Sequence, residues 1–349
     1  MWQLLRWGAA LLIALSPLYL VLYHALDELN SSPEIAPEAI SLTLDDALVF
    51  WHKGKYKESL VILDHIDKSK PEVSFYRAYF ERYLQHQVTP QLPSQTTFAE
   101  NCSQKILFVT GDVYSLAQAT VFMSRFANDE RLATLPICIE PTIWFDPAKI
   151  NCQQNQTEDG RLACDLPQLA KSLKAQNFTH LVVFADKGKA NVHNGIMFLD
   201  RQDSYDVFVH ELAHFAGFVD EYPLTGQLAA QICAGDDTPN LVFRKAGTQV
   251  IDTDYWQSIG LDSDLSLTKA RTCDNHPNQA YKVEKKLTFM EYHDVAYIPE
   301  HYLAVWQKRL STQTYSPSAH VNFAQFYEGK NNLRESQFWR TKYQGYLKN

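Results

Sequence analysis

The segment from Ser204 to Tyr222, SYDVFVHELAHFAGFVDEY, contains side chains whose spacing suits metal-dependent hydrolysis. His210 and His214 are four residues apart, so on a helix both imidazoles leave the same face about one turn apart. An imidazole pair of this kind suits Zn²⁺. Glu211 is turned by about 100° from His210, where its carboxylate can take a proton from a water molecule on the ion. We therefore expect two histidine ligands and a glutamate general base.

The residues after the histidine pair offer a third ligand. Gly217 follows His214 by three residues, where a left-handed glycine would end the helix and turn the chain back. Asp220 then becomes the favoured third metal ligand, and Glu221, one residue further on, is the alternative. Three protein ligands leave a fourth position for water, which is typical of a catalytic zinc rather than a structural one.

The quoted residues resemble a known signature. HELAHFAGFVD is similar to the metzincin zinc-peptidase motif HExxHxxGxxH, with aspartate in place of the last histidine, and the DEY that follows resembles the IgA-peptidase group of bacterial metallopeptidases. The resemblance implies a zinc metallo-endopeptidase with a twisted sheet, an active-site helix and a methionine turn beneath the metal. Outside about 20 residues of motif, the likeness is one of architecture only.

Further site residues follow from the resemblance alone. Met290 lies downstream of the motif in LTFMEYH, which resembles the methionine turn and implies that role for it. By the same likeness Tyr292 is a switchable ligand or an oxyanion donor. Metzincins bind an extended substrate along an edge strand. The segment in the corresponding place includes Asn194, Gly195, Ile196, Met197 and Phe198.

An aspartate ligand has a consequence for pH. Two neutral imidazoles and one carboxylate make zinc a weaker Lewis acid than three imidazoles do, so its water keeps a higher pKa. We therefore predict an activity optimum displaced toward alkaline pH.

The elements that must position this site are of mixed type. Apolar runs predict strands at 106–110, 137–145, 180–185 and 195–199, and helical periodicity marks 115–126 and 166–175. The expected fold class is α/β (α+β), with a zinc peptidase domain over 101–315. A disulfide-closed lobe of about 223–286 is inserted in it, and 316–349 forms a C-terminal extension packed on the domain.

The N-terminal part contains a different pattern. The uncharged stretch at 7–26 is long enough to cross a membrane, so 1–28 is expected to be a membrane anchor or a cleaved signal segment. Apolar spacing at 42–86 weakly resembles one tetratricopeptide hairpin, so 29–100 is expected to hold a small helical hairpin and a linker. The charges flanking the first segment place the rest of the chain outside the cytoplasm, in the periplasm if the protein is bacterial, or secreted if the segment is cleaved.

The six cysteines support the same compartment. They form an even set without a CxxC pair, which favours disulfides over a zinc ribbon. Nearest-neighbour pairing predicts the bonds Cys102–Cys138, Cys152–Cys164 and Cys233–Cys273.

Composition narrows the class of partner. The chain of 349 residues has a net charge of −8 and no long basic run, which argues against nucleic-acid binding. We expect zinc-dependent hydrolysis of a protein or peptide substrate outside the cytoplasm. The alternatives are a non-catalytic, zinc-stabilised scaffold protein of the envelope and a zinc amidase acting on a non-peptide substrate. The sequence does not indicate an oligomeric state.

Overall fold

The computed structural model describes most of the chain after residue 41. The described residues are 42–84, 101–111, 113–144, 152–154, 161–185, 187–236, 238–248, 253–258, 266–312 and 317–348. The chain divides into two compact units, with the boundary after Val73. The expected anchor at 1–28 lies outside the described residues. Among the residues that are described, no helix is both long and apolar enough to span a membrane.

The first unit is helical. It contains α2 (Leu44–His52) and α3 (Tyr56–His65), and the boundary falls near the start of α4 (Pro71–Leu84). Thr43 and Asp46 form a capping box that starts α2. The Ser59 hydroxyl donates to the Ala47 carbonyl oxygen at 2.6 Å, which ties α3 to α2. The expected hairpin is present as α2 and α3, and α4 is an additional helix that the periodicity did not separate.

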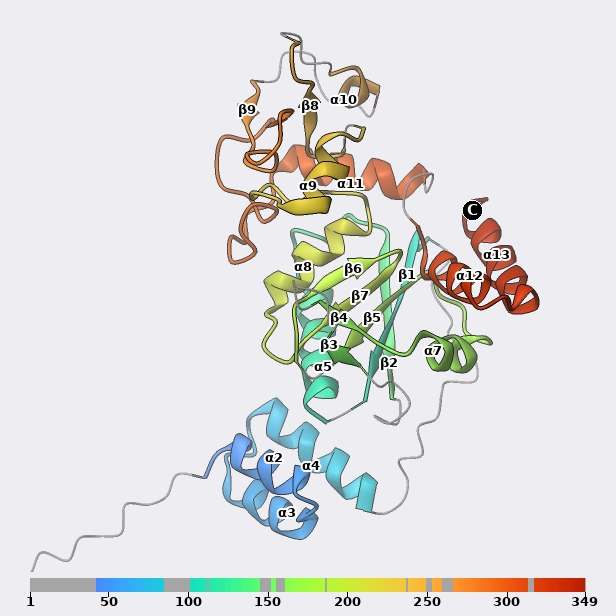
Figure 1. Cartoon of the computed structure of the whole chain (residues 1–349). Helices are drawn as coiled ribbons and strands as arrows, with labels where there is room; N and C mark the ends of the chain where they lie inside the picture. The colour runs from blue at the N-terminus through green and yellow to red at the C-terminus, as the bar shows by residue number, and fades with distance from the viewer. Residues whose placement is uncertain are drawn as a thin grey trace, which may run out of the picture. The chain divides into compact units, whose positions relative to one another are not determined.

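A five-stranded sheet forms the centre of the second unit (Figure 1). The strand order is β2-β1-β5-β7-β6, and the first four strands are parallel. Its strands are β1 (Gln104–Thr110), β2 (Ile137–Trp144), β5 (His180–Phe184), β6 (Asn191–His193) and β7 (Ile196–Leu199). The four predicted strands are confirmed, and a mixed α/β fold with a mostly parallel sheet is established.

Helices cover both faces of this sheet (Figure 1). Side chains alternate along a strand, so Phe108 packs toward one layer and Leu107 toward the other. The first layer holds α5 (Val113–Ala127), α8 (Tyr205–His214) and α11 (Glu300–Thr312). The second holds α7 (Leu166–Leu173), α12 (Ala319–Gly329) and α13 (Leu333–Tyr346). The C-terminal segment therefore packs on the domain, as expected, and buries the second face.

The segment between the HELAHFAGFVD motif and Met290 forms a small lobe. It contains α9 (Gly226–Cys233), β8 (Val242–Arg244), α10 (Asp254–Ser258), β9 (Thr268–Lys269) and β10 (Gln279–Lys282). Three of these form a sheet in the order β8-β10-β9. The lobe has a core of its own, in which the Cys233–Cys273 disulfide packs with Leu241, Phe243 and Ala280. A further pair of short strands, β3 (Gln153–Gln154) and β4 (Leu162–Ala163), lies elsewhere in the second unit.

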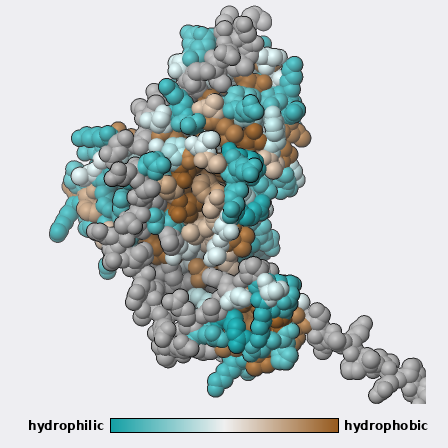
Figure 2. Space-filling view, turned by 180° about the vertical axis from the view of Figure 1, so that it is seen from behind, coloured by the Kyte–Doolittle hydropathy of each residue, from teal (hydrophilic) through white to brown (hydrophobic). Residues whose placement is uncertain are grey.

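The three disulfides follow the predicted nearest-neighbour pairing: Cys102–Cys138, Cys152–Cys164 and Cys233–Cys273. The first links the start of β1 to β2. Seen from behind, the coloured surface of each unit presents many hydrophilic residues, with hydrophobic ones gathered in limited areas between them (Figure 2). This distribution is expected for strands and helices whose apolar sides face a common core.

Candidate metal centre

Helix α8 presents the histidine pair from a firmly held position. Ser204 is its N-cap and accepts a hydrogen bond from the Val207 amide at 3.2 Å. Phe208 and Leu212 are fully buried against the sheet and α5. The amphipathic pattern thus fixes the rotation of α8, and the histidines leave its opposite side.

Gly217 ends α8 as its position predicts. Its φ is 87°, in the left-handed region. The Gly217 amide donates to the His214 carbonyl at 3.0 Å and the Phe218 amide donates to the Ala213 carbonyl at 3.3 Å, which together form a Schellman motif. The reversal brings Phe218 and Asp220 back toward the imidazoles.

Backbone carbonyls orient both imidazole rings. Nδ1 of His210 lies 2.7 Å from the Phe289 carbonyl oxygen, and Nδ1 of His214 lies 2.8 Å from that of Phe218. A carbonyl oxygen can only accept, so each Nδ1 carries a proton and donates it. In the neutral ring Nε2 then holds a lone pair, which is the tautomer that binds a metal ion.

The Asp220 carboxylate faces both of these lone pairs. Its Oδ1 lies 3.0 Å from Nε2 of His210 and 3.3 Å from Nε2 of His214. Two ligand atoms of one tetrahedral zinc ion are separated by about 3.3 Å, given metal–ligand bonds of about 2.0–2.1 Å. Asp220 Oδ1 is buried and has no hydrogen-bond partner among the residues that the structure describes. Lone pairs on three converging atoms repel one another unless a cation or a proton lies among them, so these side chains fit a metal ion.

In the absence of an ion, a proton on His214 relieves part of this repulsion. Burial opposes a charged His214, but the Asp220 carboxylate outweighs that effect and raises the pKa of His214 to about 9. Burial likewise disfavours ionised Asp220, yet the charge of His214 and the contact with His210 hold the pKa of Asp220 well below its usual range. Asp220 therefore stays ionised, and a cation that displaces the proton from His214 meets a negatively charged carboxylate.

Glu211 lies beside the pair. His210, Glu211 and His214 offer ligand atoms that all lie within 4.8 Å of one another. The Glu211 Oε2 atom is 4.0 Å from Nε2 of His214, further than Asp220 Oδ1. Burial raises the pKa of Glu211, although the neighbouring histidines lower it. Asp220 is thus the better placed third ligand, and Glu211 is within reach of a molecule next to the ion.

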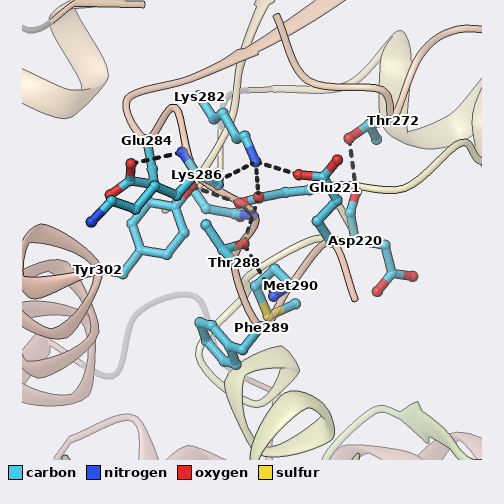
Figure 3. A network of polar contacts seen from close by, with 12 residues as sticks. Asp220, Glu221, Thr272, Lys282, Glu284, Lys286, Thr288, Phe289, Met290 and Tyr302 are labelled. Carbon is cyan, nitrogen blue, oxygen red and sulfur yellow. Dashed lines mark hydrogen bonds and ion pairs between the residues drawn. The ribbon is translucent and has the colours of Figure 1, made fainter. Parts of the chain in front are cut away.

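The carboxylate of Glu221, the alternative ligand, lies in a polar network with Lys282, Thr288 and Tyr302 (Figure 3). It is fully buried and accepts four hydrogen bonds. The donors are Asn240 Nδ2 at 3.0 Å, Lys282 Nζ at 3.0 Å, Thr288 Oγ1 at 2.7 Å and Tyr302 OH at 2.6 Å. The same Lys282 Nζ lies 2.6 Å from Glu291 Oε2. Glu221 has no free position for a metal, and its network joins the lobe and α11 to the ligand loop.

Met290 lies in a tight turn below the histidines. The amides of Glu291 and Tyr292 both donate to the Thr288 carbonyl, at 3.0 and 3.1 Å. Met290 is fully buried and its carbonyl accepts from the Glu221 amide at 2.9 Å. The Phe289 carbonyl of this turn is the partner of His210, so the turn orients that imidazole directly.

A cleft of about 320 Å³ gives access to the centre. Glu211, His214, Asp220 and Tyr222 line it. Tyr292 does not contribute to the lining; its ring is 54% exposed and stacks on His293 at 5.3 Å. Of the two tyrosines, Tyr222 lines the cleft and Tyr292 does not. Burial, followed by the charge of Asp220 and a hydrogen bond to it, raises the pKa of the Tyr222 hydroxyl. Tyr222 is the last residue of the DEY motif, but its position in the sequence did not predict that its side chain would line the cleft.

The edge of the sheet differs from the expectation. Ile196–Leu199 pairs with strands on both sides, so Ile196, Met197 and Phe198 do not form the edge. Within the described residues that place belongs to β6 (Asn191–His193). Asn194 and Gly195, both with positive φ, form the two-residue turn between β6 and β7. The prediction that 196–199 forms the edge is therefore wrong: the Asn-Gly turn folds 191–193 back alongside 196–199, so β6 is the strand at this edge.

Comparisons of the chain with protein-family models, with curated proteins and with solved structures find no match. What the cleft does chemically therefore has to follow from its own geometry.

Proposed function

We propose that the protein is a zinc-dependent peptidase that acts outside the cytoplasm. One observation carries the proposal: Asp220 Oδ1 lies 3.0 and 3.3 Å from the Nε2 atoms of His210 and His214, inside an open cleft that also contains Glu211. A buried carboxylate oxygen between two imidazole lone pairs supports a divalent cation. A glutamate beside such a centre supports hydrolysis over a purely structural role.

Each side chain has a role in this proposal. His210, His214 and Asp220 would hold Zn²⁺, which when bound would polarise the attacking water and the scissile carbonyl. Glu211 takes the proton of that water and returns it to the leaving amine. Its raised pKa suits both steps, because burial makes the carboxylate a stronger base than an exposed one. Tyr222 lines the cleft beside these groups, and burial followed by the charge of Asp220 raises the pKa of its hydroxyl.

The metzincin-like assignment belongs to the same proposal. The supporting features are the glycine-ended ligand helix, the buried methionine turn under His210 and an antiparallel strand beside the cleft. Three disulfides favour an oxidising compartment, which agrees with an N-terminal segment that anchors or exports the chain.

The test combines metal analysis with a digest. We expect the purified full-length chain to bind one zinc ion and to cleave members of a random peptide library. Glu211→Gln should retain zinc and lose turnover by about 10²–10⁴-fold, because the isosteric amide cannot accept the proton. Glu300→Gln, which changes an exposed glutamate at the start of α11, serves as the matched control and should cleave normally.

Three outcomes would contradict the proposal. Retained cleavage by Glu211→Gln would exclude the general base. Stoichiometric zinc with no cleavage by the unaltered chain would favour the zinc-stabilised scaffold. Release of product only from non-peptide amides would instead identify an amidase.

A further inference from the structure

A second pocket, with a volume of about 240 Å³, lies against the C-terminal helices. Its lining comes from residues between 102 and 105 at the start of β1, from 176–179 just before β5, and from α12 and α13. Within the described chain it shares no lining residue with the cleft of the metal centre. Ligand sites usually measure about 300–1,000 Å³, so a pocket of this size suits a small molecule.

The lining of this pocket is basic. Lys105 and Lys342 are its charged side chains, and among the described residues no aspartate or glutamate lines it. The chain as a whole is acidic, with a net charge of −8, so a site that has lysines and no acids differs from the rest of the molecule. A concave site of this sign attracts anions.

Neutral groups hold the Lys342 ammonium in place. Its Nζ donates to the carbonyl oxygens of Lys174 and Gln176, both at 2.9 Å, just past the end of α7. An ammonium has three protons, so one remains for a further acceptor. The rings of Phe178 and Trp339 have their centroids 5.9 and 5.4 Å from Nζ, where they favour a cation without balancing its charge.

The charge of Lys342 lacks a counter-ion in the part of the chain that the structure describes. The hydrogen-bond acceptors of Nζ there are the two carbonyl oxygens, not carboxylates. Burial lowers the pKa of Lys342, and no neighbouring acid raises it again. A half-buried ammonium that is oriented but not neutralised is a place where an anion gains a charge-assisted hydrogen bond.

His320 lines the same pocket as Lys342. It is only 4% exposed, its ring stacks on Trp339 at 5.7 Å, and its Nδ1 lies 3.2 Å from the Ser318 hydroxyl oxygen. Its Nε2 is buried and has no partner among the described residues. Burial, followed by the charge of Lys342, lowers the pKa of His320 to about 3, so the ring is neutral. When Ser318 donates to Nδ1, Nε2 carries the ring proton and is itself a donor.

We propose that this pocket binds a small oxyanion, a carboxylate or phosphate group, through the ammonium of Lys342, with His320 Nε2 as the second donor. The oxygens of either group accept from N–H donors in the same way, so the chemistry of recognition is shared. The bound anion would supply the missing counter-charge and link α13 to the segment 176–179. The inference does not depend on the proposed function, because the pocket and the cleft have separate linings.

The experiment is calorimetric titration of the unaltered full-length chain, with and without zinc. The probes are succinate and inorganic phosphate, and sodium chloride keeps the ionic strength constant. We expect at least one of them to bind with a Kd of about 1 mM and to raise the unfolding temperature once its concentration exceeds that value. The probe that binds more tightly identifies the source of the anion. The affinity should be the same with and without zinc.

Three variants locate the bound anion. Lys342→Gln keeps a donor for the two carbonyls of α7 but loses the charge, so binding should weaken by about ten-fold or more. His320→Phe keeps an aromatic ring against Trp339 but removes Nε2, and binding should weaken by a few-fold. Lys330→Gln changes an exposed lysine at the end of α12 that does not line the pocket, and it should bind as the parent chain does.

Several results would overturn the inference. They are the absence of binding by both probes well above the expected Kd, and unchanged affinity in a folded Lys342→Gln protein. If Lys342→Gln does not fold, His320→Phe decides, and unchanged affinity in that variant overturns the inference. Binding that requires zinc would place the anion at the metal centre instead and would overturn it as well.

Discussion

Asp220 and Glu221 are neighbours in the chain, yet their carboxylates have opposite surroundings. Asp220 Oδ1 is buried between two imidazoles and has no hydrogen-bond partner within the described part of the chain. Glu221 accepts from four donors, one of which is the buried Lys282. Lys282, Thr288 and Tyr302 are drawn around it in Figure 3. The first group is incomplete without a further cation, whereas the second is complete within the protein. A buried acid is therefore a candidate ligand only when its own neighbours leave it unsatisfied.

The two groups are also coupled through the backbone. The Glu221 amide donates to the Met290 carbonyl, and the Asp220 carbonyl accepts from the Thr272 hydroxyl at 2.8 Å. The Glu221 network thus fixes the loop that carries Asp220, and the methionine turn that carries the partner of His210. Substitutions at the two acids should accordingly separate metal binding from folding.

The largest difference is expected for the ligand itself. Asp220→Ala should lower the affinity for zinc by at least about 100-fold, because the ion loses its only carboxylate ligand. Titration against a zinc-specific chelator measures this, and circular dichroism checks that the variant is folded. If Asp220→Ala kept its zinc affinity and a folded Glu221→Gln protein lost zinc, Glu221 rather than Asp220 would be the ligand.

The second effect concerns stability. Glu221→Gln should lower the free energy of unfolding by about 3 kcal/mol, since Lys282 loses its fully buried carboxylate partner and keeps only the partly buried Glu291. Zinc affinity of the folded fraction should change by only a few-fold. Urea titration measures the free energy of unfolding. The double variant Glu221→Gln/Lys282→Met should be less destabilised than the sum of the single changes, because it removes the unpaired charge.

The third effect is on pH dependence. With the pKa of His214 at about 9 in the ion-free chain, zinc must displace a proton at neutral pH. The apparent affinity should therefore rise about tenfold per unit from about pH 7 to about pH 9 and level off above it. Asp220→Asn removes the charge that raises this pKa, so its curve should level off at lower pH. An affinity for the parent chain that is flat over this range would show that no such proton is held.

The smallest effect tests the end of the ligand helix. Gly217→Ala forces alanine to a φ of 87° and places its Cβ 2.7 Å from Arg309 Nη2, so we expect a loss of about 1–2 kcal/mol in unfolding free energy. Gly247 has a φ of 81° and no atom within 4 Å of a built Cβ, which makes Gly247→Ala the matched control for backbone strain alone. Only Gly217→Ala should also weaken zinc binding, by a few-fold, since Phe218 orients His214. If Gly217→Ala bound zinc as tightly as the unaltered chain, the turn at Gly217 would not be needed to orient His214.

Several features could be predicted from the sequence because they depend on nearby residues. The four-residue spacing of His210 and His214 determines a shared helix face, Ser204 supplies the cap, and Gly217 supplies the left-handed end. Continuous apolar runs indicated the buried strands of a mostly parallel sheet, since such strands have no solvent-facing side. The Asn-Gly pair at 194–195 was also a usable signal for the hairpin that moved the edge to β6.

The tertiary structure decided everything that depended on distant partners. The sequence favoured Asp220 but left Glu221 open as the alternative. The structure separates them because donors from Asn240 to Tyr302 bind the Glu221 carboxylate, whereas the Asp220 carboxylate faces the imidazoles. The same holds for Tyr222 over Tyr292, and for the pocket that both His320 and Lys342 line. Sequence spacing determines which side chains share one element. Which of them meet in a cleft is determined by the packing of the lobe and the turn against that element, and this information is spread over the whole chain.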